Sequence, residues 1–182
     1  EARNRPHSLL LVTKGGTKEC APLLKRKPCR NIIISFSVNA PDAARDHEKG
    51  AAPAEERIEA ARKLMAKGWR VRLRIDPMIM GYDYSGIIKA VRDAAPERVT
   101  LGCLRAEPNL LRRLKNEIFS ELEIPKGKSA LARYPRQERM RLYSQAVKAL
   151  KKVCPIGLCE ETQDVWEELG LDWRSKSCNC GE

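Results

Sequence analysis

Residues 32–39 read IIISFSVN, an apolar run that ends on polar side chains. Three consecutive isoleucines are typical of a strand that is buried on both faces, as strands of parallel sheets are. Ser35, Ser37 and Asn39 then occupy alternate positions, so an extended chain places all three on one side. We therefore expect a buried strand whose exit is lined with hydrogen-bonding groups.

Strand-like and helix-like segments alternate on both sides of this stretch. The expected strands are 9–13, 32–38, 71–77, 98–104 and 154–159. The expected helices are 53–67, 86–95, 108–119, a segment with Met140, Tyr143, Val147 and Leu150 on one stripe, and 160–169, with a loop at 125–135. This alternation predicts an α/β protein with a mostly parallel sheet, either doubly wound or barrel. The glycine patterns GxGxxG and GxxxxGK[ST] are absent from the sequence, which argues against a dinucleotide or P-loop site.

The chain has 182 residues, which favours one domain with a core of ordinary size. Its apolar runs are short and no basic and apolar leader opens it, so we expect neither a membrane partner nor a signal peptide. It starts at Glu1 rather than methionine and soon enters a strand-like run, which suggests a fragment of a longer chain.

Seven cysteines are scattered along the chain, at positions 20, 29, 103, 154, 159, 178 and 180. Their scatter fits reduced thiols in a cytoplasmic protein better than a secreted disulfide framework. Cys154 and Cys159 are candidates for a four-thiolate metal site together with Cys178 and Cys180. Neither spacing is the usual one for zinc, and the alternative for Cys154 and Cys159 is a small buried apolar side chain.

Charge is unevenly distributed within the net total of +11. Residues 105–152 hold thirteen Lys and Arg against five Glu, whereas residues 160–182 hold seven acids against two bases. A basic block suggests a phosphate-bearing partner such as nucleic acid. A solvated helical surface rich in Arg and Lys is an equally good interpretation from composition alone.

Four consecutive predicted strands each deliver polar or charged groups where they end. These groups are Lys14, the pair Ser37 and Asn39, Asp76, and Arg105. Ligands of parallel sheets bind at the carboxyl ends of the strands, so we expect one lined pocket for a small, zwitterionic, sugar-bearing molecule. Taken singly, Lys14 has the alternative of a solvated side chain and Asp76 that of a local loop cap.

Several segments, in this order and spacing, resemble the spore photoproduct lyase family of radical S-adenosylmethionine (SAM) enzymes, which are related to proteins often called DNA repair photolyases. The segments are LVTKG (11–15), SFSVN (35–39), EKG (48–50), RIEAARKLMAKG (57–68) and RLRIDP (72–77). The resemblance extends from about residue 9 to residue 166. It implies a partial βα barrel of the radical SAM type.

The resemblance also assigns roles to individual residues. It implies that Lys14, Ser37 and Asp76 border SAM, with Asn39 as a supporting residue at the same rim. Asp76 departs from the family, whose lyases typically have a small apolar residue there. The Arg133–Tyr134 pair, with Arg105, would meet the substrate, since the family has an Arg-Tyr pair that contacts the DNA lesion.

The family's CxxxCxxC loop, whose thiolates hold a 4Fe-4S cluster, does not occur in this sequence. In the family that loop precedes the segment that matches Lys14. We therefore interpret residues 1–159 as the carboxyl-terminal half of the barrel and residues 160–182 as an acidic, cysteine-containing tail. The iron–sulfur cluster and the other half-barrel would belong to a preceding segment, and this chain alone would be inactive.

The resulting functional prediction is a portion of a radical SAM lyase. The whole enzyme would cleave SAM reductively to a 5′-deoxyadenosyl radical that acts on DNA, for lesion repair, or on another substrate. One alternative is a non-catalytic, basic nucleic-acid-binding module on a degenerate βα barrel. Another is a structural domain held together by a metal at the late cysteines.

Overall fold

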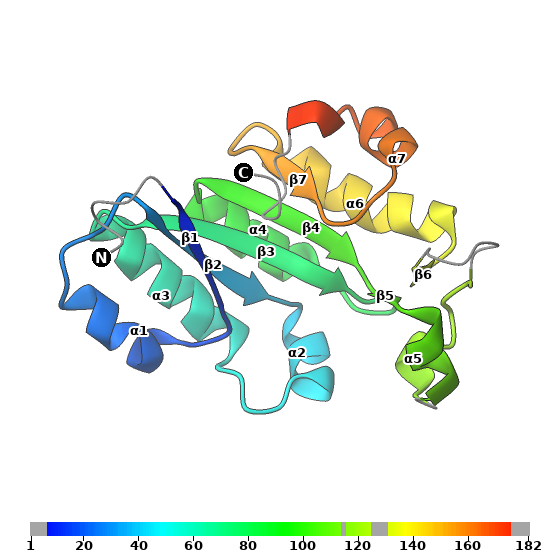
Figure 1. Ribbon diagram of the computed structural model, residues 1–182, viewed down its shortest axis with the longest axis horizontal. Coiled ribbons are helices and arrows are strands. Elements are labelled where there is room, and N and C mark those ends of the chain that lie inside the picture. Colours follow the sequence, from blue (N-terminus) through cyan, green and yellow to red (C-terminus); the bar gives the residue numbers. More distant parts are fainter. Residues whose placement is uncertain (1–6, 114–115, 125–130, 176–182) are drawn as a thin grey trace.

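A parallel five-stranded sheet forms the centre of the protein (Figure 1), and the computed structural model describes residues 7–113, 116–124 and 131–175. The strand order is β1-β2-β3-β4-β7, and each neighbouring pair is parallel. The strands are β1 (Leu9–Thr13), β2 (Ile32–Val38), β3 (Arg70–Met78), β4 (Arg98–Cys103) and β7 (Ile156–Leu158). The predicted α/β class and parallel sheet are therefore confirmed.

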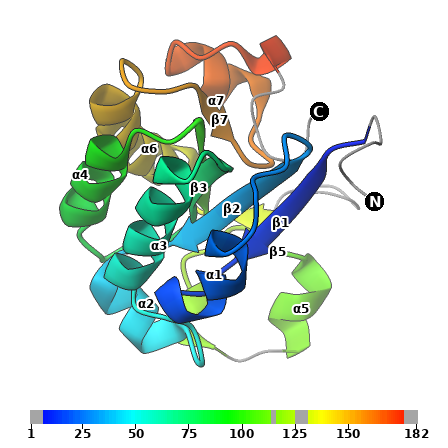
Figure 2. The same cartoon turned by 90° about the vertical axis from the view of Figure 1, so that its left-hand side faces the viewer.

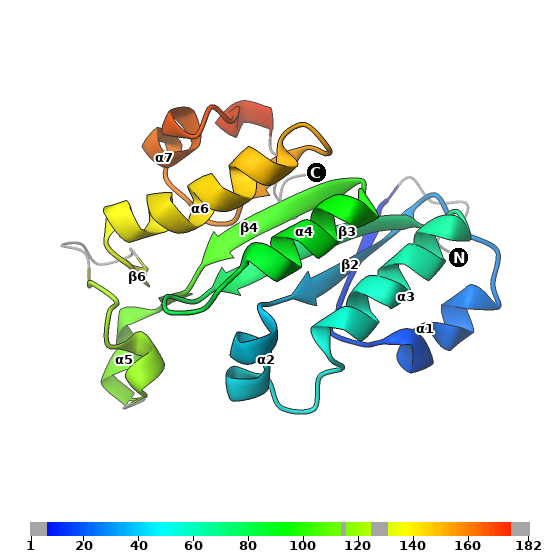
Figure 3. The ribbon, with the colours of Figure 1, turned by 180° about the vertical axis from the view of Figure 1, so that it is seen from behind.

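Helices connect the strands and cover one face of the sheet, as Figure 3 shows for α3, α4 and α6. The helices are α1 (Thr17–Leu24), α2 (Pro41–His47), α3 (Ala54–Ala66), α4 (Ser85–Ala94), α5 (Pro108–Arg113), α6 (Arg136–Leu150) and α7 (Gln163–Glu168). Two 3-10 turns, η2 (Glu117–Phe119) and η3 (Trp173–Ser175), complete the described elements. No helix among the described residues is both long and apolar enough to cross a membrane.

Four segments differ from the sequence-based expectation. Helices α1 and α2 were not expected, because both are short and lack a long apolar stripe. The helix expected over 108–119 is present only as α5 and the separate turn η2. Within the loop expected at 125–135, residues 132 and 133 form a short strand, while residues 125–130 lie outside the described part.

The two faces of the sheet differ in chemistry. On β2, Ile34, Phe36 and Val38 join the apolar core formed with the helices, and Ser35 and Ser37 alternate with them toward the other face. The same alternation on β3 turns the apolar positions 71, 73 and 75 to the helices and the polar positions 72, 74 and 76 to the opposite face. In Figure 2, α3 and α4 lie on one side of the sheet and α5 on the other. One polar face is what a partial βα barrel would present to its interior.

A pair of short antiparallel strands, called the hairpin below although residues 107–131 separate them, follows β4. Its strands are β5 (Arg105–Ala106) and β6 (Ala132–Arg133), and Arg105 pairs with Arg133. Figure 1 shows the hairpin and α5 at the end of the sheet toward which the strand arrows of β3 and β4 point. The hairpin thus places its two arginines at the carboxyl edge of the sheet.

The expected acidic tail starts within the described part of the chain. Helix α7 buries Val165 and Trp166, and both belong to the same core as the sheet. The division at residue 159 stays a prediction, and residues 176–182, which include Cys178 and Cys180, lie outside the described residues.

Candidate functional site at the carboxyl edge of the sheet

A continuous line of contacts joins the carboxyl ends of β1, β2 and β3. The Lys14 ammonium lies 3.0 Å from the Glu48 carboxylate, which lies 2.5 Å from the Arg57 guanidinium. Arg57 Nη1 donates to the backbone oxygen of Ser37 at 2.9 Å. The Ser37 hydroxyl donates to the backbone oxygen of Asp76 at 3.3 Å. Three predicted site residues, Lys14, Ser37 and Asp76, are therefore linked at one edge.

Sequence reasoning missed the two residues that complete this line. Arg57 is 1% exposed, and its Nε also donates to the backbone oxygen of Ala52 at 2.6 Å. A signal was present: Arg57 lies four residues before Ala61 and seven before Leu64, so it falls on the buried stripe of α3. An arginine on such a stripe needs a buried acceptor, and Glu48 supplies one.

Glu48 is ionised although it is nearly buried. Burial would raise the pKa of Glu48, but its hydrogen bonds and charge interactions with Arg57 and Lys14 outweigh this effect and lower the pKa. The Lys14 ammonium is 42% exposed and borders a cavity of about 640 Å³. Thr13, Lys14, Gly15, Lys18, Glu19, Lys49, Gly50, Ala51, Ala52 and Glu56 line this cavity. Three lysines and two glutamates thus line a charged recess next to β1.

Asn39 is held on both sides of its amide. Its Oδ1 accepts from the Ala40 N–H at 3.0 Å and from the Tyr84 hydroxyl at 2.9 Å. Its Nδ2 donates to the backbone oxygen of Pro77 at 3.1 Å. Asn39 is 2% exposed, so the structure places it as a tie between β2 and the end of β3. Its predicted role in cofactor binding stays a prediction.

Asp76 is the centre of a charged cluster. Its carboxylate accepts from Arg105 Nη1 at 2.9 Å and also pairs with Arg74. The Arg105 guanidinium pairs in addition with Glu160, and its Nη2 lies 3.1 Å from the Cys159 sulfur. Burial would raise the pKa of Asp76, but its hydrogen bonds and charge interactions with Arg105 and Arg74 outweigh burial and hold the pKa below its usual value. Asp76 is thus an anion that fixes two cations at the strand ends.

Gly102 of β4 leaves the space for this cluster. A Cβ at this position would lie 2.5 Å from Asp76 Oδ1 and 3.0 Å from Arg105 Nη1. Real Cβ atoms do not approach fixed atoms so closely, so a side chain here would displace the Asp76–Arg105 pair. The sequence shows the glycine but not its partners, which come from other strands.

Of the two residues predicted to contact the substrate, Arg133 is partly exposed and Tyr134 is buried. The Arg133 side chain is 23% exposed, and its guanidinium lies 3.3 Å from the Glu161 carboxylate. Tyr134 is 2% exposed, and its hydroxyl accepts from the Met80 N–H at 3.3 Å. Arg133 therefore faces the region of Arg105, whereas Tyr134 packs beneath the hairpin. Contact between Tyr134 and a substrate stays a prediction and would require the hairpin to shift.

The described cysteines do not gather into a metal site. No group of three or more His, Cys, Asp or Glu side chains suited to a metal ion occurs among the described residues. Cys154 is buried, which raises the pKa of its thiol to about 11. Cys159 is also buried and contacts Arg105 and Arg74 through its sulfur. Cys178 and Cys180 lie outside the described residues, so a site that includes them stays a prediction.

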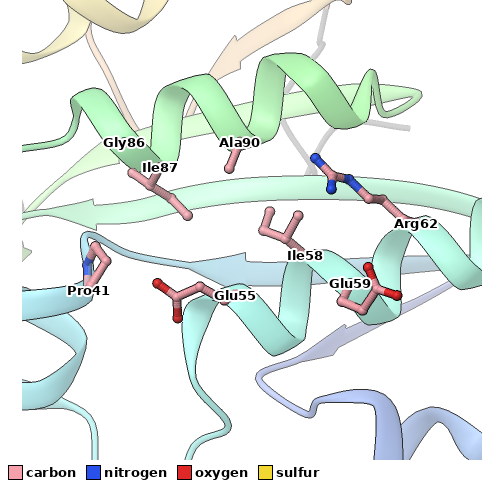
Figure 4. Close-up of a pocket in the computed structure, with 8 residues that line it drawn as sticks. All are labelled: Pro41, Glu55, Ile58, Glu59, Arg62, Gly86, Ile87 and Ala90. Carbon is pink, nitrogen blue, oxygen red and sulfur yellow. The ribbon is translucent and has the colours of Figure 1, made fainter.

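Another cavity, of about 330 Å³, lies away from this edge, between α3 and α4 (Figure 4). Its lining consists of Pro41, Glu55, Ile58, Glu59, Arg62, Gly86, Ile87 and Ala90. None of the site residues predicted from the sequence lines it. The candidate site is therefore the carboxyl edge, where the predicted residues converge.

The fold and these contacts define an α/β protein of the partial βα-barrel class, with polar groups gathered where parallel strands end. Among solved structures, the chain is similar to those of spore photoproduct lyase. A mutant with the dinucleoside spore photoproduct has a TM-score of 0.68 at 16% identity, over 84% of this chain and 52% of that chain. The lyase complexed with the same dinucleoside gives 0.66, also at 16% identity, over 84% and 51%. A mutant with bound AdoMet (SAM) and the dinucleoside gives 0.63 at 16% identity, over 82% and 50%.

These comparisons confirm the predicted resemblance at the level of fold. The chain spans about half the length of the lyases it matches. No protein-family model and no curated protein matches the sequence.

Proposed function

We propose that this chain is the carboxyl-terminal half of a radical SAM enzyme of the spore photoproduct lyase type. The main evidence is the fold match, which covers 84% of this chain but about half of the lyase. The line of contacts from Lys14 to Arg105 supports the proposal, because it lies at the edge where parallel barrels bind ligands. When bound beside a reduced cluster, SAM supplies such enzymes with hydrogen-atom abstraction.

The residues at the carboxyl edge fit parts of SAM. The Lys14 ammonium is partly exposed and suits a carboxylate, such as that of the methionine moiety. The Ser37 hydroxyl donates a hydrogen bond to the backbone oxygen of Asp76. The hydroxyl oxygen therefore remains an acceptor for an ammonium or a ribose hydroxyl. Asp76 is already paired with Arg74 and Arg105, so it would border the ligand as part of this ion cluster rather than as a free anion. Asn39 would hold the rim in shape.

The described residues do not fit the iron–sulfur cluster. A cluster needs several thiolates, and Cys103 and Cys154 are buried thiols whose pKa values are raised to about 12 and about 11 by burial. The proposal therefore places the cluster in the other half of the barrel. No cysteine of the described part is in a disulfide, which suits a cytoplasmic location.

The β1 edge of the sheet offers a place for that other half. Within the described part of the chain, β1 pairs with β2 alone, so its other side carries no strand. Leu9, Leu11 and Val12 are 47%, 37% and 54% exposed there. Exposed apolar side chains on a free edge are unusual in isolated sheets, and further strands would cover them. The partner half of the barrel is the proposed occupant.

The hairpin arginines, Arg105 and Arg133, are the proposed contacts to DNA or another anionic substrate. A purely nucleic-acid-binding module remains the alternative. That module would draw on more of the basic block, where Arg136 and Arg139 on α6 also pair with acids of the same chain. A site on the hairpin needs only the two arginines at the carboxyl edge.

The direct test uses the complete reading frame, expressed without oxygen and supplied with iron and sulfide. We expect the absorbance of an iron–sulfur cluster and cleavage of SAM under a reductant. A complete protein with a CxxxCxxC loop that forms no cluster and leaves SAM intact would contradict the proposal, as would a reading frame that lacks the loop.

A binding measurement tests the role of Lys14 separately. In the same protein, Lys14→Met should weaken SAM binding about fivefold to tenfold, the loss of one charge-assisted contact. Lys63→Met is the matched control, since Lys63 also has a single carboxylate partner, Glu59, but lies on the outer helix α3. Equal affinities for the two variants, measured by equilibrium dialysis, would remove Lys14 from the site.

A further inference from the structure

Arg105 and Arg133 stand directly opposite each other in the antiparallel hairpin. The backbone N–H and C=O of Arg133 bond Glu123 on its other side, so Arg105 and Arg133 form a non-hydrogen-bonded pair. Side chains of such a pair share one face and lie closer than those of a hydrogen-bonded pair. Two like charges in this position oppose pairing unless anions neutralise them.

Two consecutive glutamates after β7 supply the anions. The Glu160 carboxylate pairs with Nε of Arg105. Glu161 contacts Arg133 Nη1 at 3.3 Å and Arg139 Nε at 3.0 Å. One dipeptide thus neutralises both arginines of the hairpin.

The two glutamates differ sharply in environment. The Glu161 side chain is 1% exposed and also accepts from the Thr162 N–H at 2.9 Å, so it is a fixed structural anion. The Glu160 side chain is 54% exposed, and its backbone is left-handed, with φ of 50°. That conformation is unfavourable for a residue with a Cβ. The Glu160 carboxylate therefore pairs with Arg105 from an accessible position, where a competing anion can displace it.

The charge around Glu160 indicates which kind of group would displace its carboxylate. Glu160 belongs to a cluster of four arginines and three acids: Arg74, Arg105, Arg133, Arg139, Asp76, Glu160 and Glu161. Without the Glu160 carboxylate, the cluster has an excess of two positive charges. Phosphate oxygens accept from guanidinium groups as carboxylate oxygens do, and a phosphate carries more charge.

We propose that the Arg105–Arg133 pair is a binding site for a phosphate group of a ligand, and that Glu160 is the carboxylate which this phosphate displaces. Asp76 remains in place and anchors the Nη1 side of Arg105, while Arg105 Nε turns from Glu160 to the ligand. This inference rests on the proposed function, because that function makes the hairpin arginines substrate contacts.

The test measures binding of two probes, inorganic pyrophosphate and a short single-stranded DNA oligonucleotide, to the native protein and to Glu160→Gln. We expect Glu160→Gln to tighten binding about threefold to fivefold, the range of one exposed ion pair. Asp164→Asn is the matched control: it removes one exposed acid of the same segment, but Asp164 pairs with Arg136 on α6. Its affinity should stay within about twofold of the native protein.

The possible results distinguish a failure of the phosphate site from a failure of the proposed radical SAM function. A gain in Glu160→Gln that Arg105→Gln abolishes supports the site, and a gain for pyrophosphate alone identifies a small phosphate ligand rather than DNA. Equal binding by Glu160→Gln and Asp164→Asn overturns the role of Glu160. Absence of phosphate binding in every variant overturns the site itself, while SAM binding and its dependence on Lys14 would stand unaffected. Thermal unfolding of each variant verifies that it folds.

Discussion

Asp76 and Gly102 act as a matched pair of residues on neighbouring strands. Asp76 carries the charge that fixes Arg74 and Arg105, and Gly102 supplies the volume that the Asp76–Arg105 contact occupies. A glycine normally weakens a strand, so its presence inside β4 has a compensating reason. That reason is the close approach of a carboxylate and a guanidinium.

Substitution of Gly102 should disturb this site more than substitution of an open glycine. Gly102→Ala places a methyl group 2.5 Å from Asp76 Oδ1, and we expect a loss of about 1–3 kcal/mol in the free energy of unfolding. Gly86→Ala is the control, because a Cβ at Gly86 meets nothing within 4 Å. Urea unfolding measures the free energy of unfolding of both variants. Equal values would refute the steric conflict between a side chain at position 102 and Asp76.

The Asp76 carboxylate should also give a recognisable pH dependence. Its pKa is lower in the folded protein than in the unfolded chain, so it stabilises the fold at neutral pH and loses this effect as pH falls through its folded pKa, below about 4. Asp76→Asn should cost about 3 kcal/mol at pH 7, because two partly buried arginines lose their shared anion. The difference in unfolding free energy between the native protein and the variant should shrink toward pH 3. A difference that is constant from pH 7 to pH 3 would show that Asp76 is not the titrating group.

At the scale of elements, β1 is the least protected strand of the sheet. It pairs only with β2 among the described strands, and Val12 is 54% exposed at this edge. Natural sheets usually place charges on free edges because an uncharged edge pairs with other chains. The isolated chain should therefore associate through β1.

A charge placed on β1 should reduce that association. In the chain as given, we expect Val12→Lys to shift sedimentation velocity profiles toward the monomer at tens of micromolar protein. Leu110→Lys is the matched control, since Leu110 is 41% exposed but lies on α5, away from the sheet edge. If both variants shift equally, general hydrophobicity rather than the edge causes the association.

At the scale of the whole molecule, the two charge blocks of the sequence meet in the fold. Arg105, Arg133, Arg136 and Arg139 all pair with acids from the segment 160–168. The count of thirteen Lys and Arg in residues 105–152 therefore overstates the positive charge that is free to contact a polyanion, because these four arginines are paired. Composition alone left a nucleic-acid partner and a solvated helical surface equally open, and the ion pairs favour a small anion site over an extended one.

The salt dependence of oligonucleotide binding distinguishes these two surfaces. Single-stranded DNA that contacted all thirteen Lys and Arg side chains of residues 105–152 would give a slope of log K against log salt of about −9. A site limited to the two hairpin arginines, Arg105 and Arg133, should give about −1 to −2. Fluorescence anisotropy between 50 and 300 mM salt, as an approximate range around physiological ionic strength, measures the slope. A slope near the steeper value would favour the extended nucleic-acid-binding module.

Local patterns were sufficient to predict most of the sheet. The alternation of apolar segments with helix signals predicted all five parallel strands, and the polar exits predicted that Lys14, Ser37 and Asp76 would lie at one edge. Glu48 and Arg57 were missed, because a buried ion pair is defined by a partner rather than by a local pattern. The position of Arg57 on an apolar stripe was the one local sign of it.

The sequence by itself determined the α/β class, the order of the strands along the chain and the polar side of IIISFSVN. These features depend on periodicity and on neighbours within a few residues. Only the tertiary structure decided that Ser37 bonds the backbone of Asp76, that Gly102 makes room for Arg105, and that the acids after β7 neutralise the hairpin arginines. Each of these contacts joins residues far apart in the chain, and their partners are chosen by the packing of strands against one another, which no local stretch of sequence specifies.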